Sequence, residues 1–212
     1  MIKKTIPGLI LCILLSNLIF SQDKNDEEPQ VLIGNNIKNI SGFGGLLIDF
    51  SSIDGKLTVS TGGGGAVLLN QIFYFGGYGF GNRSEKTLIN PFSGPQQMNL
   101  DFGHGGIWLG YIFKPKKLIH YNISSKFGWG NIRISEKQGS HEPILSDNVF
   151  CFTPQIEGEI NISYWFRINA SVGYRLVEGV HNDYFKPGDF SSPAVGISFI
   201  FGWFKEFSFP KF

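Results

Sequence analysis

The stretch FTPQIEGEINISYWFRINASVGYRL, residues 152–176, alternates apolar and polar side chains over most of its length. Successive side chains of a β-strand point to opposite faces, so this period of two predicts strands. The apolar face carries Ile156, Gly158, Ile160, Ile162, Phe166, Ile168, Ala170, Val172, Tyr174 and Leu176. The polar face carries Gln155, Glu157, Glu159, Asn161, Arg167, Asn169, Ser171, Gly173 and Arg175. We expect two strands with a turn at residues 163–165 between them.

The first residues have the pattern of a secretory signal peptide. Lys3 and Lys4 precede an apolar run, residues 6–20, and small and polar residues follow it. The run is shorter than the roughly 20 apolar residues of a spanning helix, so we expect cleavage, after Ser21. Cys12 lies inside the apolar run, which does not fit a lipoprotein site. Residues 1–21 are thus the predicted signal peptide, and residues 22–40 the predicted disordered periplasmic tail.

The composition narrows the classes of function. A formal net charge of +1 with 17% charged residues gives no support for nucleic-acid binding. Behind the predicted signal peptide Cys151 is the single cysteine, so an intramolecular disulfide is not expected. The chain has 28 Gly and 21 Phe, which is typical of a β-barrel with closely spaced strands and aromatic residues at its ends.

Eight segments beyond residue 40 have the pattern of strands. We expect them at residues 43–50, 56–69, 72–80, 98–113, 118–132, 150–162, 166–177 and 193–204. Lipid offers no hydrogen-bond partner to an open sheet edge, so strands that cross a membrane must close on themselves. The predicted fold is therefore all-β, an eight-stranded antiparallel up-and-down transmembrane β-barrel over residues 41–204. Residues 205–212 would be the end of the last strand or a short tail.

The lengths of the predicted connections follow a pattern of their own. Tight turns are expected at residues 70–71, 114–117 and 163–165, and long polar loops at residues 81–97, 133–149 and 178–192. The first connection, residues 51–55, is short and breaks this order. Long loops on one rim and tight turns on the other are typical of bacterial outer-membrane barrels.

Alternation alone leaves open which face is inside. A soluble periplasmic barrel that binds an apolar ligand would turn the apolar face inward, whereas a membrane barrel turns it to lipid. Strands of about 12 residues match the roughly 9–11 that a tilted crossing needs. Aromatic residues also collect at strand ends, at residues 164–166 and 203–204. The residues predicted to face lipid are Ile156, Ile160, Ile162, Phe166, Ile168, Val172, Tyr174 and Leu176.

Two glycine-rich runs, residues 62–65 and 103–106, interrupt the alternation. Neither opens a helix or precedes a Lys-Ser/Thr pair, so they do not fit a phosphate-binding loop. We expect bulges there, or the close approach of bulky lumen side chains. Ile107 and Trp108 could face lipid together only across such a bulge.

The polar face predicts what fills the barrel. An eight-stranded barrel is wide enough only for its own side chains, so a conducting pore is not expected. With the turn centred on Tyr164, Asn161 faces Arg167, and Glu159 lies diagonally from Arg167. Buried charges persist when they are paired, which predicts a plug of ion pairs. The predicted lumen network is Gln155, Glu157, Glu159, Asn161, Arg167, Asn169, Arg175, His120 and Lys126, with Asn122 and Ser124 beside it.

An outer-leaflet lipid-modifying enzyme is the alternative function. His120 and Ser124 share a predicted face, but four residues of strand span about 13 Å, too far for a base to reach its nucleophile. The loop pairs Ser140-His141 and His181 with Asp183 are closer, but such pairs are ordinary in loops. The histidines show no recurrent ligand spacing, so neither a metal nor another cofactor is expected.

The last long loop, residues 180–190, places aromatic residues beside charged ones. This composition suits a surface that contacts a partner, a glycan or lipopolysaccharide. It suits an aromatic belt at the membrane surface equally well.

Over residues 41–212 the chain resembles small outer-membrane barrels of the OmpA transmembrane-domain and OmpX type. The signal peptide, the eight strands, the loop asymmetry and the terminal Phe212 carry this resemblance, from which Pro210 departs. The glycine-rich opening at residues 41–45 and the Ser21-Gln22 exit resemble uncharacterised proteins of Bacteroidota. The resemblance implies an outer-membrane location, insertion by the barrel-assembly machinery, and a structural, adhesive or ligand-contacting role of the extracellular loops.

Overall fold

The computed structural model describes residue 37 and residues 39–90, 94–136, 144–182 and 184–204. The predicted signal peptide, the predicted tail as far as residue 36, and residues 205–212 lie outside this range. No helix in the described part of the chain is long and apolar enough to span a membrane.

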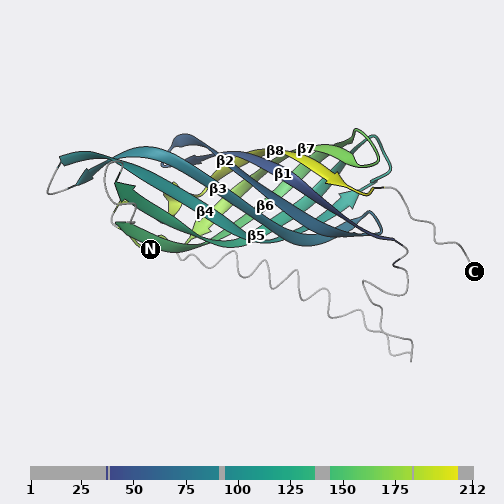
Figure 1. The fold of residues 1–212 in the computed structure, drawn as a ribbon, viewed down its shortest axis with the longest axis horizontal. Coiled ribbons are helices and arrows are strands. Elements are labelled where there is room, and N and C mark those ends of the chain that lie inside the picture. The colour runs from purple at the N-terminus through teal and green to yellow at the C-terminus, as the bar shows by residue number, and fades with distance from the viewer. Residues whose placement is uncertain (1–36, 38, 91–93, 137–143, 183, 205–212) are drawn as a thin grey trace, which may run out of the picture. The chain divides into compact units, whose positions relative to one another are not determined.

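The described residues form a closed antiparallel barrel of eight strands, which confirms the predicted fold class (Figure 1). Each strand pairs with its neighbours in the sequence, and β1 pairs with β8 to close the sheet. A single 3₁₀ turn, η1 (Pro187–Asp189), lies between β7 and β8. The strands are β1 (Ile40–Ile53), β2 (Lys56–Leu69), β3 (Phe73–Asn90), β4 (Gly94–Phe113), β5 (Ile119–Glu136), β6 (Leu145–Asn161), β7 (Phe166–Glu178) and β8 (Ser192–Gly202).

Two of the predicted long loops are wrong, because most of their residues are strand. β3 and β4 pair without interruption from Phe73↔Tyr111 to Asn90↔Gly94, through the expected loop at 81–97. β5 and β6 likewise continue into the expected loop at 133–149. The backbone ladder needs only N–H and C=O groups. A hairpin that projects beyond its neighbours is wetted on both faces, so it needs no apolar alternation.

The expected bulges are absent from the ladders of the described glycine runs. The pairing of β2 with β1 and β3 runs residue by residue through Gly62–Gly65, and that of β4 runs through Gly103–Gly106. Trp108 points into the barrel with 2% of its surface exposed, whereas Ile107 is 39% exposed on the outside. The bulge was expected because the interior was assumed to be polar, and this assumption is wrong for one side of the barrel.

An apolar cluster fills the interior between β1, β2, β3, β4 and β8. Its buried members are Leu47, Ala66, Leu68, Tyr74, Tyr78, Trp108, Ile112 and Ile200. The rings of Phe43, Tyr74 and Trp108 meet edge to face, with centroids 5.2–5.6 Å apart. Rings fit here because glycines lie opposite them: a Cβ at Gly64 would lie 3.3 Å from Trp108, and one at Gly110 would overlap the ring of Tyr74. This is the close approach that the glycine runs predicted.

The Gly110→Ala variant tests this packing. The added methyl group meets the ring of Tyr74, which cannot move aside because Phe43 and Trp108 pack against it. We expect the free energy of unfolding to fall by about 1–3 kcal/mol, the usual cost of overpacking. Urea unfolding in detergent micelles, followed by tryptophan fluorescence, measures it.

Gly158→Ala is the matched control, since a Cβ at Gly158 on the outer face meets nothing within 4 Å. The Gly110→Ala/Tyr74→Ala double variant separates overpacking from a backbone effect. If removing the ring does not reduce the cost of the methyl group, the packing explanation is contradicted.

Candidate functional site

The structure places the predicted polar residues on the inner faces of β5, β6 and β7. Eight of the nine are buried, and Asn161 lies half-buried at the tight-turn end. Their exposed fractions are Gln155 8%, Glu157 1%, Glu159 4%, Arg167 3%, Asn169 3%, Arg175 2%, His120 5% and Lys126 6%. The strand period places them there, since each of these strands turns every second side chain inward.

Glu157 is the centre of this network. Its carboxylate accepts hydrogen bonds from Ser124 and Asn122 on β5, from Gln155 on β6 and from Asn169 on β7. Four donors thus converge on one side chain that is 1% exposed. A buried carboxylate is tolerated only with such compensation.

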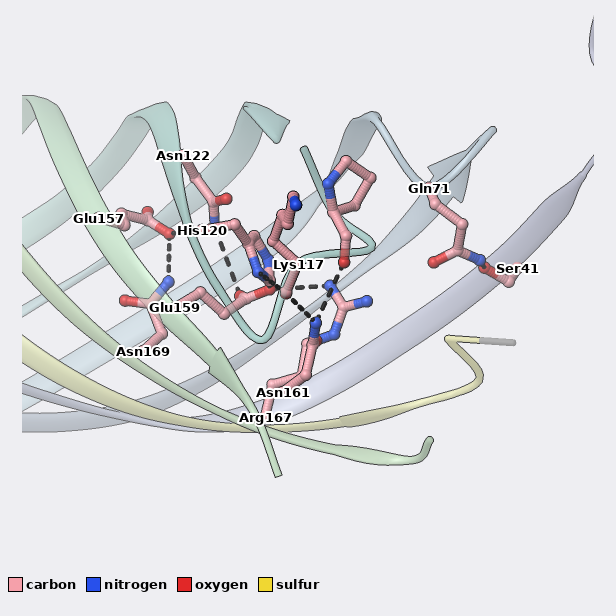
Figure 2. Close-up of polar contacts among 11 residues, drawn as sticks. Ser41, Gln71, Lys117, His120, Asn122, Glu157, Glu159, Asn161, Arg167 and Asn169 are labelled. Atoms are coloured by element: carbon pink, nitrogen blue, oxygen red, sulfur yellow. Dashed lines mark hydrogen bonds and ion pairs between the residues drawn. The ribbon is translucent and has the colours of Figure 1, made fainter. Parts of the chain in front are cut away.

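Glu159 forms a second centre closer to the tight turns (Figure 2). Its Oε1 lies 2.8 Å from Nε2 of His120 and 2.8 Å from Nη1 of Arg167. The register pairs Asn161 with Arg167, so Glu159 reaches Arg167 diagonally, as the turn position predicted. The guanidinium of Arg167 stacks on Phe204, 3.6 Å from the ring centroid. Arg167 therefore connects the ion pair to the segment that follows β8.

Lys126 connects the polar side of the interior to the aromatic side. Its Nζ donates to Oε1 of Gln155 at 3.0 Å, and it lies 5.3 Å and 5.2 Å from the ring centroids of Phe80 and Trp108. A desolvated ammonium group gains from such ring faces. Lys126 thus contacts both the polar and the aromatic side of the lumen.

The loop between β7 and β8 closes the opposite end of the barrel. Phe185 and Phe190 are 5% and 0% exposed in a second apolar cluster, which also contains Cys151 and Val177; Phe190 packs on Phe102, and Phe185 packs on Phe190. Both expectations for this loop, a partner surface and an aromatic belt, are therefore wrong for its two phenylalanines. Their rings fill the mouth because the interior below them is apolar.

Arg175 anchors the plug, by which we mean the part of the β7–β8 loop that carries Phe185 and Phe190. Its Nε donates to the Phe190 carbonyl at 3.1 Å, its Nη1 to Oγ of Ser51 at 2.8 Å, and its Nη2 to the Ser52 carbonyl at 3.2 Å. The guanidinium lies 5.2 Å from the ring centroid of Phe102. One buried cation thus ties β1, β7 and the loop together.

Two cavities bear on whether the barrel can bind a ligand. Between the polar network and the aromatic cluster the void is about 10 Å³, room for about one water molecule. At the tight-turn end a cavity of about 760 Å³ opens between the β4–β5 and β6–β7 turns, with Arg167 among its lining residues. The middle of the lumen is filled, and the usable space lies at the mouth.

The residues considered for catalysis are engaged elsewhere. His120 contacts Glu159, whereas Ser124 donates to Glu157. In the loops, His181 contacts Asp147 and Gly179, while Ser140, His141 and Asp183 lie outside the described residues. No group of three or more His, Cys, Asp or Glu suited to a metal ion occurs within the described ranges.

The sequence reasoning missed the lumen side chains of β3 and β4. Tyr74, Tyr78 and His104 point inward beside Trp108, and the hydroxyl of Tyr78 lies 3.2 Å from Nδ1 of His104. Spacing offers no signal here, because aromatic residues and glycines occur at both even and odd positions of the two strands. Both faces of these strands are apolar, so their period does not identify the inner face.

Comparisons with known proteins find fold similarity alone. No family model and no curated protein matches the chain. Neisserial surface protein A is similar with a TM-score of 0.50 and 10% identity, over 79% of this chain and 97% of that one. The attachment invasion locus protein Ail of Yersinia pestis, in complex with the heparin analogue sucrose octasulfate, has a TM-score of 0.44 and 14% identity, over 77% and 96% of the chains. The N-terminal β-barrel domain of Pseudomonas aeruginosa OprF has a TM-score of 0.44 and 11% identity, over 78% and 98%.

These neighbours are small eight-stranded barrels of bacterial outer membranes. At such identities the similarity concerns the fold. The class defined by fold and interior is therefore the closed eight-stranded barrel with a filled lumen.

Proposed function

We propose that this chain is an outer-membrane barrel of a bacterial cell, with a structural or adhesive role and no open pore. The observation that carries the proposal is the sorting of its side chains. Ile156, Val172 and Val195 are 59%, 58% and 52% exposed on the outer face, while Glu157, Glu159, Arg167 and Arg175 of β6 and β7 are buried inside. Apolar side chains around the outside of a closed barrel suit a lipid surround.

The filled lumen argues against the soluble carrier. A barrel that carried an apolar ligand would need an apolar cavity inside, of the size of typical ligand pockets. The void in the middle of this lumen is about 10 Å³, and Glu157, Glu159 and Arg167 are among its lining residues. It has neither the volume nor the lining for such a ligand.

Aromatic side chains support the same location. Tyr164, Trp165 and Trp203 are 74%, 58% and 52% exposed at the tight-turn rim. Tyrosine and tryptophan prefer the boundary between hydrocarbon and water, because their rings are apolar and their N–H or O–H groups are polar. We place this rim at the periplasmic boundary, with the bilayer and lipopolysaccharide as surroundings.

The proposed contact surface for an extracellular partner is the β3–β4 hairpin. β2 pairs with β3 only as far as Gly81, and β5 pairs with β4 only from Met98, so the hairpin between them projects beyond its neighbours (Figure 1). Its base carries the exposed ion pair of Arg83 with Asp101 at 3.3 Å. In the loop between β7 and β8, in contrast, the two phenylalanines are buried and close that end of the barrel.

Single-cysteine labelling tests the membrane location. In a Cys12→Ser/Cys151→Ser background, we expect Val172→Cys and Ile156→Cys to react in intact membranes with a lipid-soluble maleimide and not with a charged one. Lys56→Cys, at the exposed start of β2, is the matched control and should react with the charged reagent. Equal reaction of the outer-face cysteines with the charged reagent would contradict a lipid surround.

A further inference from the structure

The cavity at the tight-turn mouth has the form of a binding site. Its volume is about 760 Å³, and it lies between the β4–β5 and β6–β7 turns. Asn161, Arg167 and Gln71 supply its polar groups, while Leu118, Ile162 and Phe204 line it with apolar surface. Figure 2 shows Gln71 and Arg167 reaching into this end of the barrel from opposite sides.

The charge of this mouth is positive. Lys114, Lys116 and Lys117 are exposed on the β4–β5 turn, and Arg167 lies beneath them. The carboxylate of Glu159, two residues deeper along β6 than Asn161, is already bonded to His120 and Arg167. Among the described residues at this mouth the four cations thus exceed the one carboxylate, and an anionic ligand would be attracted.

Three buried polar atoms here have no hydrogen-bond partner among the described residues. They are Nε of Arg167, Oδ1 of Asn161 and Oε1 of Gln71. Arg167 and Gln71 are 3% and 4% exposed, so the absence of partners is costly. The orientation of the Asn161 amide is defined, because its Nδ2 donates to the carbonyls of Pro115 and Lys117 at 3.1 Å and 2.8 Å. Its Oδ1 is therefore an acceptor.

These atoms specify the chemistry of a ligand. Arg167 offers a donor, so the ligand needs an anionic acceptor, and a guanidinium suits phosphate oxygens. Asn161 offers an acceptor, so the ligand must also donate. A carboxylate accepts only, whereas a phosphate that carries a glycerol has oxygens that accept and hydroxyls that donate.

We propose that this mouth binds a hydroxyl-bearing phosphate of the glycerol phosphate type, with the phosphate on Arg167 and the lysines and a hydroxyl on Asn161. Two sources share this chemistry: free glycerol phosphate and the head group of phosphatidylglycerol. The apolar walls at Leu118 and Ile162, which are 67% and 54% exposed, would contact the acyl chains of the lipid. The proposal concerns the cavity itself and holds whether or not the outer face contacts lipid.

Calorimetric titration of the full chain in dodecyl maltoside micelles tests the proposal. The probes are glycerol 3-phosphate, dihexanoyl phosphatidylglycerol, dihexanoyl phosphatidylcholine and acetate. We expect one or both glycerol phosphate probes to bind, with phosphatidylcholine and acetate at least tenfold weaker. Binding of both assigns the site to the head-group chemistry, and binding of the lipid alone assigns it to the membrane source. If neither binds, or acetate binds as well, the proposal is overturned.

Two variants locate the binding. Arg167→Lys keeps the charge beside Glu159 but loses the planar guanidinium, and it should raise Kd about tenfold or more. Lys116→Gln/Lys117→Gln alters exposed side chains that folding does not require, and it should raise Kd about two- to fivefold. Arg83→Gln, at the far end of the barrel, is the matched control. An unchanged Kd in both mouth variants, or an equal loss in Arg83→Gln, contradicts this site.

Discussion

Replacement of Glu157 by alanine is expected to lower the free energy of unfolding by about 3–5 kcal/mol, the cost of removing one partner from a buried charged network. The carboxylate accepts from Ser124, Asn122, Gln155 and Asn169; three of these donors would lose this acceptor, and Asn122 would keep only its bond to Glu159. Small domains are stable by about 5–15 kcal/mol, so the variant would lose a large part of its stability. Urea unfolding in micelles and the heat-dependent gel mobility of the folded barrel measure the change.

Two controls separate this network from a general effect of charge. Glu157→Gln keeps an acceptor oxygen but brings an NH₂ group toward the existing donors, so we expect an intermediate loss. Glu178→Ala removes a carboxylate from an exposed position at the far end of β7 and should change stability by less than about 0.5 kcal/mol. A loss below about 1 kcal/mol for Glu157→Ala would mean that solvent already reaches the network.

Replacement of Arg175 by alanine is expected to release the plug between β7 and β8 and to cost about 3–5 kcal/mol. The variant removes three hydrogen bonds, to the Phe190 carbonyl, to Ser51 and to the Ser52 carbonyl. It also leaves the carboxylate of Asp49, 3.9 Å from Nη1, without this cation. The plug would then be held chiefly by its phenylalanines.

Cys151 provides a native reporter for this release. Its side chain is 0% exposed within the same cluster as Phe185 and Phe190. We expect a water-soluble thiol reagent to label Cys151 faster in Arg175→Ala than in the unchanged chain, both in a Cys12→Ser background. Arg133→Ala, an exposed arginine at the same end, is the matched control, and Cys151→Ser gives the blank. Unchanged labelling together with lowered stability would show that Arg175 supports the barrel but not the plug.

The interior of the barrel is thus filled at two levels. The polar network around Glu157 and Glu159 fills the tight-turn half of the β5–β7 side, and the cluster under Phe190 fills the opposite end. We propose its projecting β3–β4 hairpin and its tight-turn mouth as contact surfaces.

Several features of the fold and the interior followed from local pattern. β2 (Lys56–Leu69) has the expected bounds, because a change of pattern and the residues Asp54-Gly55 mark its start. The contact of Glu159 with Arg167 followed from the turn at Tyr164, since one short turn determines the register of the hairpin. On β6 and β7 one face is apolar and the other polar, so parity alone separated the two faces.

Other features depend on residues that are distant in the sequence. The apolar side of the lumen was not predicted, since a ring such as Tyr74 finds its space only where Gly110 lies on the neighbouring strand. The extension of β3 and β4 was missed, because a backbone ladder forms regardless of side-chain polarity.

The sequence by itself determined the number of strands and, on β6 and β7, the sorting of polar and apolar faces, because these follow from a period of two between adjacent residues. Only the tertiary structure decided how the interior is filled. Arg175 meets Ser51 across 124 residues of sequence, and a plug loop meets the opposite wall. Such contacts arise when β1 pairs with β8, and closure of the sheet is a property of the whole chain that no local pattern encodes.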